Sequence, residues 1–239
     1  MSLYTISDLH LSLGCNKPMT LFGGRWQDHT EKLRKRWTSL VTENDTVVLP
    51  GDFSWALTLD ETKEDFLFLA SLPGKKILSK GNHDFWWSSV TKMNAFLADL
   101  GITDVSFLHN NAFLADNTVL CGSRGWFIEE KLQAGAFDTD YTKLVNRECE
   151  RLLYSLGEGK KLKGGRDMPT VVFLHFPPVY RDFVCEPIMK ILSESSIARV
   201  YYGHVHGDYY VPSTFDADGV KLSLVSADYL NFIPQKIFL

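Results

Sequence analysis

Short runs of apolar and β-branched residues recur along the chain, and each gives way abruptly to polar residues. Five of these runs predict buried strands, at residues 3–7, 46–50, 75–79, 170–174 and 199–202. Apolar residues at helical spacing lie between them and predict helices over 31–42, 60–71, 88–100, 141–156 and 184–192. After residue 207 further strands are predicted at 209–211 and 220–225. Alternating strands and helices followed by a group of strands predict an α/β fold with two mixed sheets.

Residues that can bind metals follow all five strand-like runs. They are Asp8 and His10, then Asp52, then Asn82, His83 and Asp84, then His175, and finally His204 and His206. Sites in open α/β sheets form beyond the carboxyl ends of the strands, so these side chains are expected to meet. Alternate strand residues share a face, which would aim Asp8 and His10 at one point. Each motif alone also fits a turn or a buried histidine, but together they predict a site for zinc, manganese or iron.

The order of these motifs, from Asp8 to His206, resembles that of the calcineurin-like metallophosphoesterases. Gly-Asp-Phe-Ser-Trp from Gly51 and Gly-Asn-His-Asp-Phe-Trp-Trp from Gly81 resemble a bacterial branch of predicted phosphohydrolases. The resemblance implies a four-layer αββα sandwich, in which helices flank two mixed β-sheets, and a centre of two divalent metal ions. It assigns Asp8, His10 and His206 to one ion, Asn82, His175 and His204 to the other, and Asp52 to both. These donor types leave manganese, iron and zinc as alternatives.

The same resemblance implies hydrolysis of a phosphodiester or phosphomonoester bond in a small molecule or nucleotide. A hydroxide bridging the metals would attack phosphorus in line. His83 would face the leaving-group oxygen as a general acid or stabilise charge there, and Asp84 would orient a histidine or close its turn. Many family members carry an Asp where this chain has Trp55, which disfavours phosphoprotein substrates and leaves open what orients His83. A non-catalytic metal-binding protein-interaction module is the alternative, which the complete set of ligand positions disfavours.

Other residues are candidates for substrate handling. Arg124, in a glycine-flanked turn, could bind phosphate together with Asn82 and His83, or it could be a surface arginine. The pair Trp86-Trp87 fits the core better than a stacking platform. Residues 11–28 form a long connection without periodicity directly after His10, and long loops of this kind are often lids. We therefore expect this segment to cover the site.

Composition narrows the class of protein. The 239 residues fit a single domain over 1–239, and 45% of them are hydrophobic, enough for a large core. A net charge of -4 makes long nucleic acids unlikely partners, and no apolar run is long enough for a membrane span. The four cysteines form no Cys-x-x-Cys pair, and the first ligand follows the first strand too closely for a cleavable signal, so a cytoplasmic protein is expected. A small-molecule phosphate ester is the expected partner; protein partners are not indicated.

Overall fold

The computed structural model describes residues 1–126 and 141–238. Within them, one sheet has the order β13-β1-β2-β3-β4 and a second the order β11-β12-β10-β7-β6-β5. The first sheet consists of β1 (Leu3–Thr5), β2 (Thr46–Pro50), β3 (Lys75–Ser79), β4 (Val105–Phe107) and β13 (Gln235–Lys236). The second consists of β5 (Phe113–Ala115), β6 (Thr118–Ser123), β7 (Thr170–Leu174), β10 (Arg199–Tyr202), β11 (Thr214–Ala217) and β12 (Val220–Leu224). A separate hairpin pairs β8 (Val179–Tyr180) with β9 (Phe183–Val184).

Both large sheets are parallel at the centre and antiparallel at their edges. Strands β1 to β4 pair in parallel, as do β6, β7, β10 and β12. The antiparallel partners are β13 in the first sheet, and β5 and β11 in the second. Because the central strands of each sheet run the same way, their carboxyl ends lie along one edge of that sheet.

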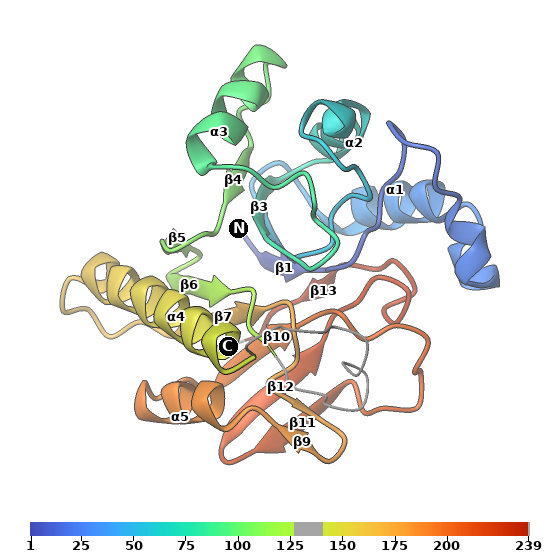
Figure 1. The fold of residues 1–239 in the computed structure, drawn as a ribbon. Helices are drawn as coiled ribbons and strands as arrows, with labels where there is room; N and C mark the ends of the chain where they lie inside the picture. The colour runs from blue at the N-terminus through green and yellow to red at the C-terminus, as the bar shows by residue number, and fades with distance from the viewer. Residues whose placement is uncertain (127–140, 239) are drawn as a thin grey trace.

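Helices cover the outer face of each sheet (Figure 1). The first sheet carries α1 (His29–Leu40), α2 (Lys63–Ala70) and α3 (Val90–Asp99), and the second carries α4 (Tyr141–Lys163) and α5 (Glu186–Glu194). Short 3-10 helices are η1 (Met19–Phe22), η2 (Gly24–Trp26) and η3 (Asp60–Thr62). None of the described helices combines the length and apolar character needed to cross a membrane.

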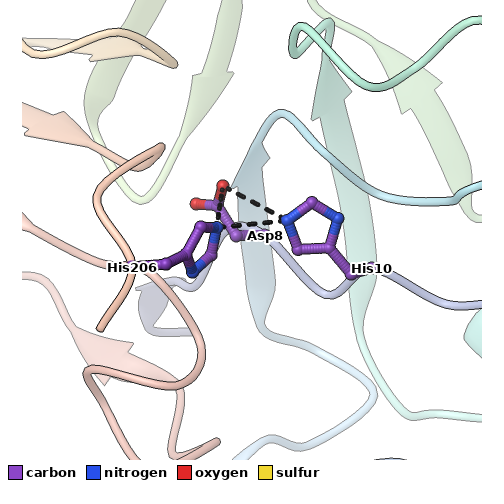
Figure 2. Close-up of side chains that lie close together, drawn as sticks. All are labelled: Asp8, His10 and His206. Carbon is purple, nitrogen blue, oxygen red and sulfur yellow. Dashed lines mark hydrogen bonds and ion pairs between the residues drawn. The ribbon is translucent and has the colours of Figure 1, made fainter. Parts of the chain in front are cut away.

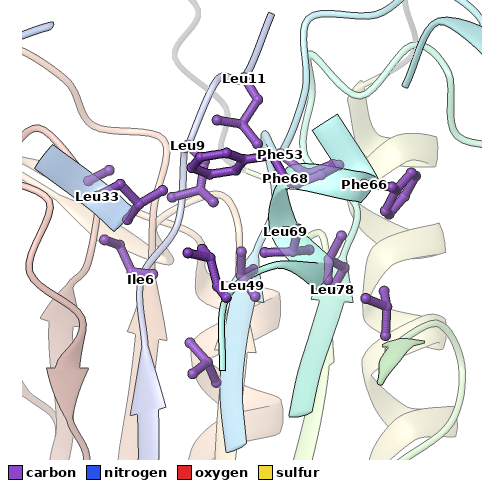
Figure 3. Close-up of a cluster of buried hydrophobic side chains, with 14 of the residues drawn as sticks. Ile6, Leu9, Leu11, Leu33, Leu49, Phe53, Phe66, Phe68, Leu69 and Leu78 are labelled. Atoms are coloured by element: carbon purple, nitrogen blue, oxygen red, sulfur yellow. The ribbon is translucent and has the colours of Figure 1, made fainter. Parts of the chain in front are cut away.

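Three apolar cores separate the four layers, and the alternation of side chains along each strand decides which core a residue joins. Val47 and Leu49 of β2 face α1 and α2, whereas Val48 faces the second sheet. In β7, Val172 faces α4 and α5, whereas Phe173 faces the first sheet. Figure 3 shows side chains of α1, α2, β2 and β3 gathered in the outer core of the first sheet. This arrangement confirms the predicted αββα sandwich.

Two local predictions were wrong. Residues 209–211 form a turn rather than a strand, and Tyr210 is 99% exposed. The glycines and the missing apolar period of the basic stretch 160–166 predict a solvated loop, but Lys160, Lys161 and Lys163 lie in the last turn of α4. Cations are stabilised there by the partial negative charge of the helix end.

Candidate metal centre

All seven predicted metal ligands follow the carboxyl ends of β1, β2, β3, β7 and β10, but the strands themselves do not aim them. β1 ends at Thr5, and the backbone is left-handed at four of the ligands, namely Asp8 (φ 57°), His10 (φ 46°), Asp52 (φ 52°) and His204 (φ 68°). Such conformations cost roughly 1–3 kcal/mol each in non-glycine residues and collect at functional sites. Sharp turns beyond the strands, and not strand alternation, therefore direct Asp8 and His10.

Asp8, His10 and His206 form the first group of donors (Figure 2). The Nε2 atom of His206 lies 3.1 Å from Asp8 Oδ1 and 3.1 Å from His10 Nε2. Asp8 is fully buried and also accepts hydrogen bonds from the His204 amide and the Ser226 hydroxyl. Two ring nitrogens and a carboxylate oxygen thus converge on one point.

Asn82, His175 and His204 form the second group. Asn82 Oδ1 lies 2.6 Å from His175 Nε2 and 2.9 Å from His204 Nδ1. Burial lowers the pKa of His175 to about 4, so its ring is neutral at pH 7 and carries a single N–H. With that N–H on Nδ1, the ring donates to the carbonyl of Pro50 at 3.1 Å. In this tautomer the lone pair of His175 Nε2 faces an amide oxygen, and a cation between the two would satisfy both.

Asp52 lies between the two groups. Its Oδ2 is 3.7 Å from His10 Nε2 and 3.5 Å from His175 Nε2, while its Oδ1 accepts the backbone N–H of His83 at 2.8 Å. Asp8, Asp52 and His175 each also offer one ligand atom to a cluster spanning no more than 4.8 Å. Burial, followed by Asp8 and Asp84, raises the pKa of Asp52 well above its usual value. A nearby cation would oppose that rise.

The electrostatic environment of His206 also favours a cation. Burial acts to lower the pKa of His206, but Asp8 and Asp228 outweigh it and raise the pKa to about 10. A metal ion at Nε2 would satisfy the same two carboxylates without the proton. The donor types, their convergence and the negative charge of Asp8 and Asp228 fit divalent metal ions.

Two glycines of the ligand motifs are required by close approach of the backbone. A Cβ at Gly81 would lie 2.1 Å from Asp52 Oδ1, and one at Gly203 would lie 2.1 Å from Asp8 Oδ2. Each glycine therefore makes room for a ligand that belongs to another strand end.

Asp84 connects two of the ligand loops. Its Oδ2 accepts the backbone N–H of Asp52 at 2.9 Å and of Gly81 at 2.8 Å, and its Oδ1 accepts that of Phe53 at 2.9 Å. Burial raises the pKa of Asp84 to about 6, against these hydrogen bonds. Of the two roles expected for Asp84, this geometry matches closure of the turn.

Trp55 packs directly against His83. The two ring centroids are 4.4 Å apart, and Trp55 also stacks on His10 at 4.7 Å. Lys17 Nζ lies 3.2 Å from the centroid of the Trp55 ring. Burial, and after it the charge of Lys17, lowers the pKa of His83 to about 4. His83 is thus held by ring packing, and its Nδ1 is buried without a hydrogen-bond partner among the described residues.

Asp228 is a site residue that sequence reasoning missed. Its Oδ1 lies 2.8 Å from His206 Nδ1, which leaves Nε2 of His206 to face Asp8. Its Oδ2 accepts hydrogen bonds from the Gly207 amide at 3.1 Å and the Tyr209 hydroxyl at 3.0 Å. A carboxylate behind a metal-binding histidine fixes its tautomer and orientation. No motif surrounds Asp228 in the sequence, so only its burial in the fold reveals it.

The remaining candidates for substrate handling lie either in the apolar core or next to the candidate site. Trp86 is buried and donates to Asp84 Oδ1 at 3.0 Å, so it belongs to the core, as expected. The guanidinium of Arg124 contacts buried Glu148 at 3.4 Å and lies over the Trp126 ring, while its backbone carbonyl accepts the His175 amide at 3.0 Å. Arg124 is therefore adjacent to the second donor group through its backbone.

The sequence model of the family described as calcineurin-like phosphoesterase matches residues 1–208. No curated protein matches the sequence significantly. The solved structure of phosphopantetheinyl hydrolase (PptH) from Mycobacterium tuberculosis is similar, with 16% identity over 99% of this chain and 95% of that chain and a TM-score of 0.57. TT1561 of Thermus thermophilus is similar as well, with 11% identity over 95% of this chain and 89% of that chain and a TM-score of 0.61. At these identities the two structures establish a shared fold.

Proposed function

The chain belongs to the calcineurin-like phosphoesterase family, a family of metal-dependent hydrolases, and from that premise we propose a dinuclear hydrolase of small phosphate esters. The substrate would be a phosphodiester or phosphomonoester of a small molecule or nucleotide. The position of Asp52 carries this proposal, because its Oδ2 lies 3.7 Å from a nitrogen of one donor group and 3.5 Å from a nitrogen of the other. A carboxylate in that position can serve two cations at once.

The proposed ligands are Asp8, His10 and His206 for one ion, Asn82, His175 and His204 for the other, and Asp52 for both. When bound, such ions neutralise charge on phosphoryl oxygens and lower the pKa of water to near neutrality. The protein's contribution is to fix the donors: Asp228 orients His206, the Pro50 carbonyl orients His175, and Asp84 joins the loops of Asp52 and Asn82.

His83 is the proposed proton donor to the leaving oxygen. With a pKa of about 4 its ring is neutral at pH 7 and keeps one N–H, which can donate a hydrogen bond to the ester oxygen. An anionic phosphoryl group beside the ring favours the imidazolium form and raises this pKa, which brings a transferable proton within reach of neutral pH. Packing of Trp55 on His83 restricts the ring to this position.

The proposal is tested by stripping the enzyme with a chelator, adding Mn²⁺ and measuring turnover of an aryl phosphodiester and its monoester. Turnover should require metal and fall by at least a hundredfold in Asp52→Asn. Asp218→Asn is the matched control, because Asp218 has the same left-handed φ of 52° but lies exposed in the turn between β11 and β12. Turnover that persists in the chelator, or in Asp52→Asn, would contradict the proposal. The ratio of the two rates assigns diesterase or monoesterase activity.

A further inference from the structure

A cavity of about 300 Å³ opens beside the first donor group, and its lining combines residues of the site with apolar side chains. The polar lining residues are His10, His83, His206 and Asp228, with the backbone of Gly207. The apolar side chains, which form the apolar wall, are Met19, Phe22, Trp26 and Trp55. Three of those four side chains are aromatic, so the cavity suits a ring next to the donor group.

The apolar wall is built from two distant parts of the chain. Met19, Phe22 and Trp26 come from η1 and η2, in the segment expected to act as a lid, and Trp55 follows the Asp52 loop. The lid is attached to Trp55, because Met19 Sδ lies 2.9 Å from Trp55 Nε1. Phe22 and Trp55 are nearly parallel, with 9° between their planes and 6.1 Å between their centroids.

The apolar wall is held in place by the fold, but one of its side chains, Phe22, is exposed to solvent. Trp26 is buried and packs edge-on against Phe232 at 5.3 Å, which fixes it to the rest of the fold. Phe22 is 54% exposed at the rim, and a ligand in the cavity would cover part of its ring. Burying exposed aromatic surface is favourable, so Phe22 is a ready contact for an apolar group.

The residues around the cavity restrict where a ring can pack. None of the described residues that line it is Lys or Arg, but Lys17 Nζ lies 3.2 Å from the centroid of the Trp55 ring. Its carboxylate, Asp228, is already occupied by His206, Gly207 and Tyr209. His10 stacks on the Trp55 ring at 4.7 Å, so Phe22 is the aromatic surface left exposed for a ligand. Flat rings stack on aromatic faces.

We propose that this cavity holds the leaving group of the substrate and that this leaving group carries an aromatic ring. The inference rests on the proposed function and deepens it: the substrate class is a phosphate ester of an alcohol that bears an aryl or base-like ring. His83 lines the same cavity as Phe22, so the ester oxygen would lie beside the proposed proton donor when the ring packs on Phe22.

Binding tests the inference independently of turnover. The Mn²⁺-loaded protein would be titrated by calorimetry with benzylphosphonate, cyclohexylmethylphosphonate and methylphosphonate, whose C–P bonds resist hydrolysis. Stacking of one ring on an aromatic side chain is worth roughly fivefold or more in affinity. Benzylphosphonate should therefore bind at least fivefold more tightly than each of the other two, and Phe22→Leu should reduce this advantage while Phe22→Ala removes it.

Leu21→Ala is the matched control, because Leu21 is 78% exposed in the same 3-10 helix and does not line the cavity. It should retain the full preference for benzylphosphonate. Equal affinity for the benzyl and methyl compounds would overturn the inference, as would equal affinity for the benzyl and cyclohexylmethyl compounds.

Turnover separates the inference from the function on which it rests. The substrates would be benzyl phosphate and ethyl phosphate, esters of alcohols with similar acidity. The expected result is a higher kcat/KM for benzyl phosphate than for ethyl phosphate, with the ratio lowered in Phe22→Ala and retained in Leu21→Ala. Equal hydrolysis of both esters in the wild type and in Phe22→Ala would overturn the inference and leave the hydrolase intact. Selective binding of benzylphosphonate without metal-dependent hydrolysis of any ester would support the inference that the cavity binds an aromatic ring. It would contradict the proposed hydrolase function.

Discussion

Asp228 lies behind His206 at the candidate metal centre. Its Oδ1 accepts a hydrogen bond from His206 Nδ1 at 2.8 Å and so keeps Nε2 directed at Asp8. Loss of such a carboxylate commonly weakens metal affinity by roughly 10- to 100-fold. Asp228→Asn keeps the size of the side chain but removes the charge, and we expect Mn²⁺ affinity measured by calorimetry to fall within that range.

Tyr209→Phe is the control for this change. It removes a hydroxyl that donates to Asp228 Oδ2 at 3.0 Å but leaves the carboxylate and its bond to His206 in place. We expect the affinity for Mn²⁺ to change by less than about threefold, which is under about 1 kcal/mol. Equal weakening in both variants would contradict a specific role for the Asp228 charge.

Site residues that directly follow a strand could be predicted from the sequence. Site residues that are positioned by the rest of the fold could not. Asp8, Asp52 and His175 could be found because each directly follows an apolar run, and the structure brings them within a few ångströms. Asp228 could not, since it is separated from any motif and meets His206 only through the path of the chain after β12. The contact of Trp55 with His83 was equally inaccessible, because it depends on the shape of two turns.

Helix α4 contains two glycines that we expect to respond oppositely to substitution. A Cβ at Gly157 would meet nothing within 4 Å, whereas one at Gly159 would lie 2.6 Å from Cys121 Sγ and 2.8 Å from Val119 Cγ1 of β6. Gly157→Ala should raise the free energy of unfolding by about 0.5–1 kcal/mol, because alanine favours the helix. Gly159→Ala should lower it by about 1–3 kcal/mol through overpacking.

Urea denaturation of the two variants and the wild type measures both effects, and each variant is the control for the other. Equal stabilisation by the two changes would show that α4 can move away from β6 and would contradict the close packing. The glycines also explain why a helix ending at residue 156 was predicted: Gly157 and Gly159 interrupt the pattern, but packing on β6 carries the helix on to Lys163.

Short edge strands were the least predictable elements. β5 and β11 have three and four residues and are half-exposed, so they lack the apolar runs that revealed β2 and β7. Residues 209–211 showed the opposite error. Tyr209-Tyr210-Val211 is typical of a strand, but the Tyr209 hydroxyl is bound to Asp228 in a turn, and tertiary contacts override the local preference.

At the scale of the whole molecule, the buried carboxyl group of Asp65 makes the free energy of unfolding depend on pH. Asp65 is fully buried, accepts hydrogen bonds from the Leu13 amide at 2.8 Å and the Ser54 hydroxyl, and so ties segment 11–28 to the Asp52 loop. Burial raises its pKa from 3.8 to about 6. Its contribution to stability is therefore complete below pH 3.8 and is lost as pH rises through 6.

The expected loss is about 3 kcal/mol between about pH 4 and pH 7. Asp65→Asn cannot ionise, so the difference in unfolding free energy between wild type and variant should change by about this amount across that interval. Chemical denaturation at several pH values measures it. A difference that stays constant with pH would contradict an elevated pKa at Asp65.

Sharing of Asp52 by two metal ions is the central claim, and electron paramagnetic resonance of the Mn²⁺-loaded protein tests it most directly. Two Mn²⁺ ions per chain that share a carboxylate are expected to give a spin-coupled spectrum. Asp52→Asn should lose the coupling, whereas Asp218→Asn should retain it. Binding of a single Mn²⁺ per chain, or an uncoupled spectrum in the wild type at two equivalents, would contradict a dinuclear centre built on Asp52.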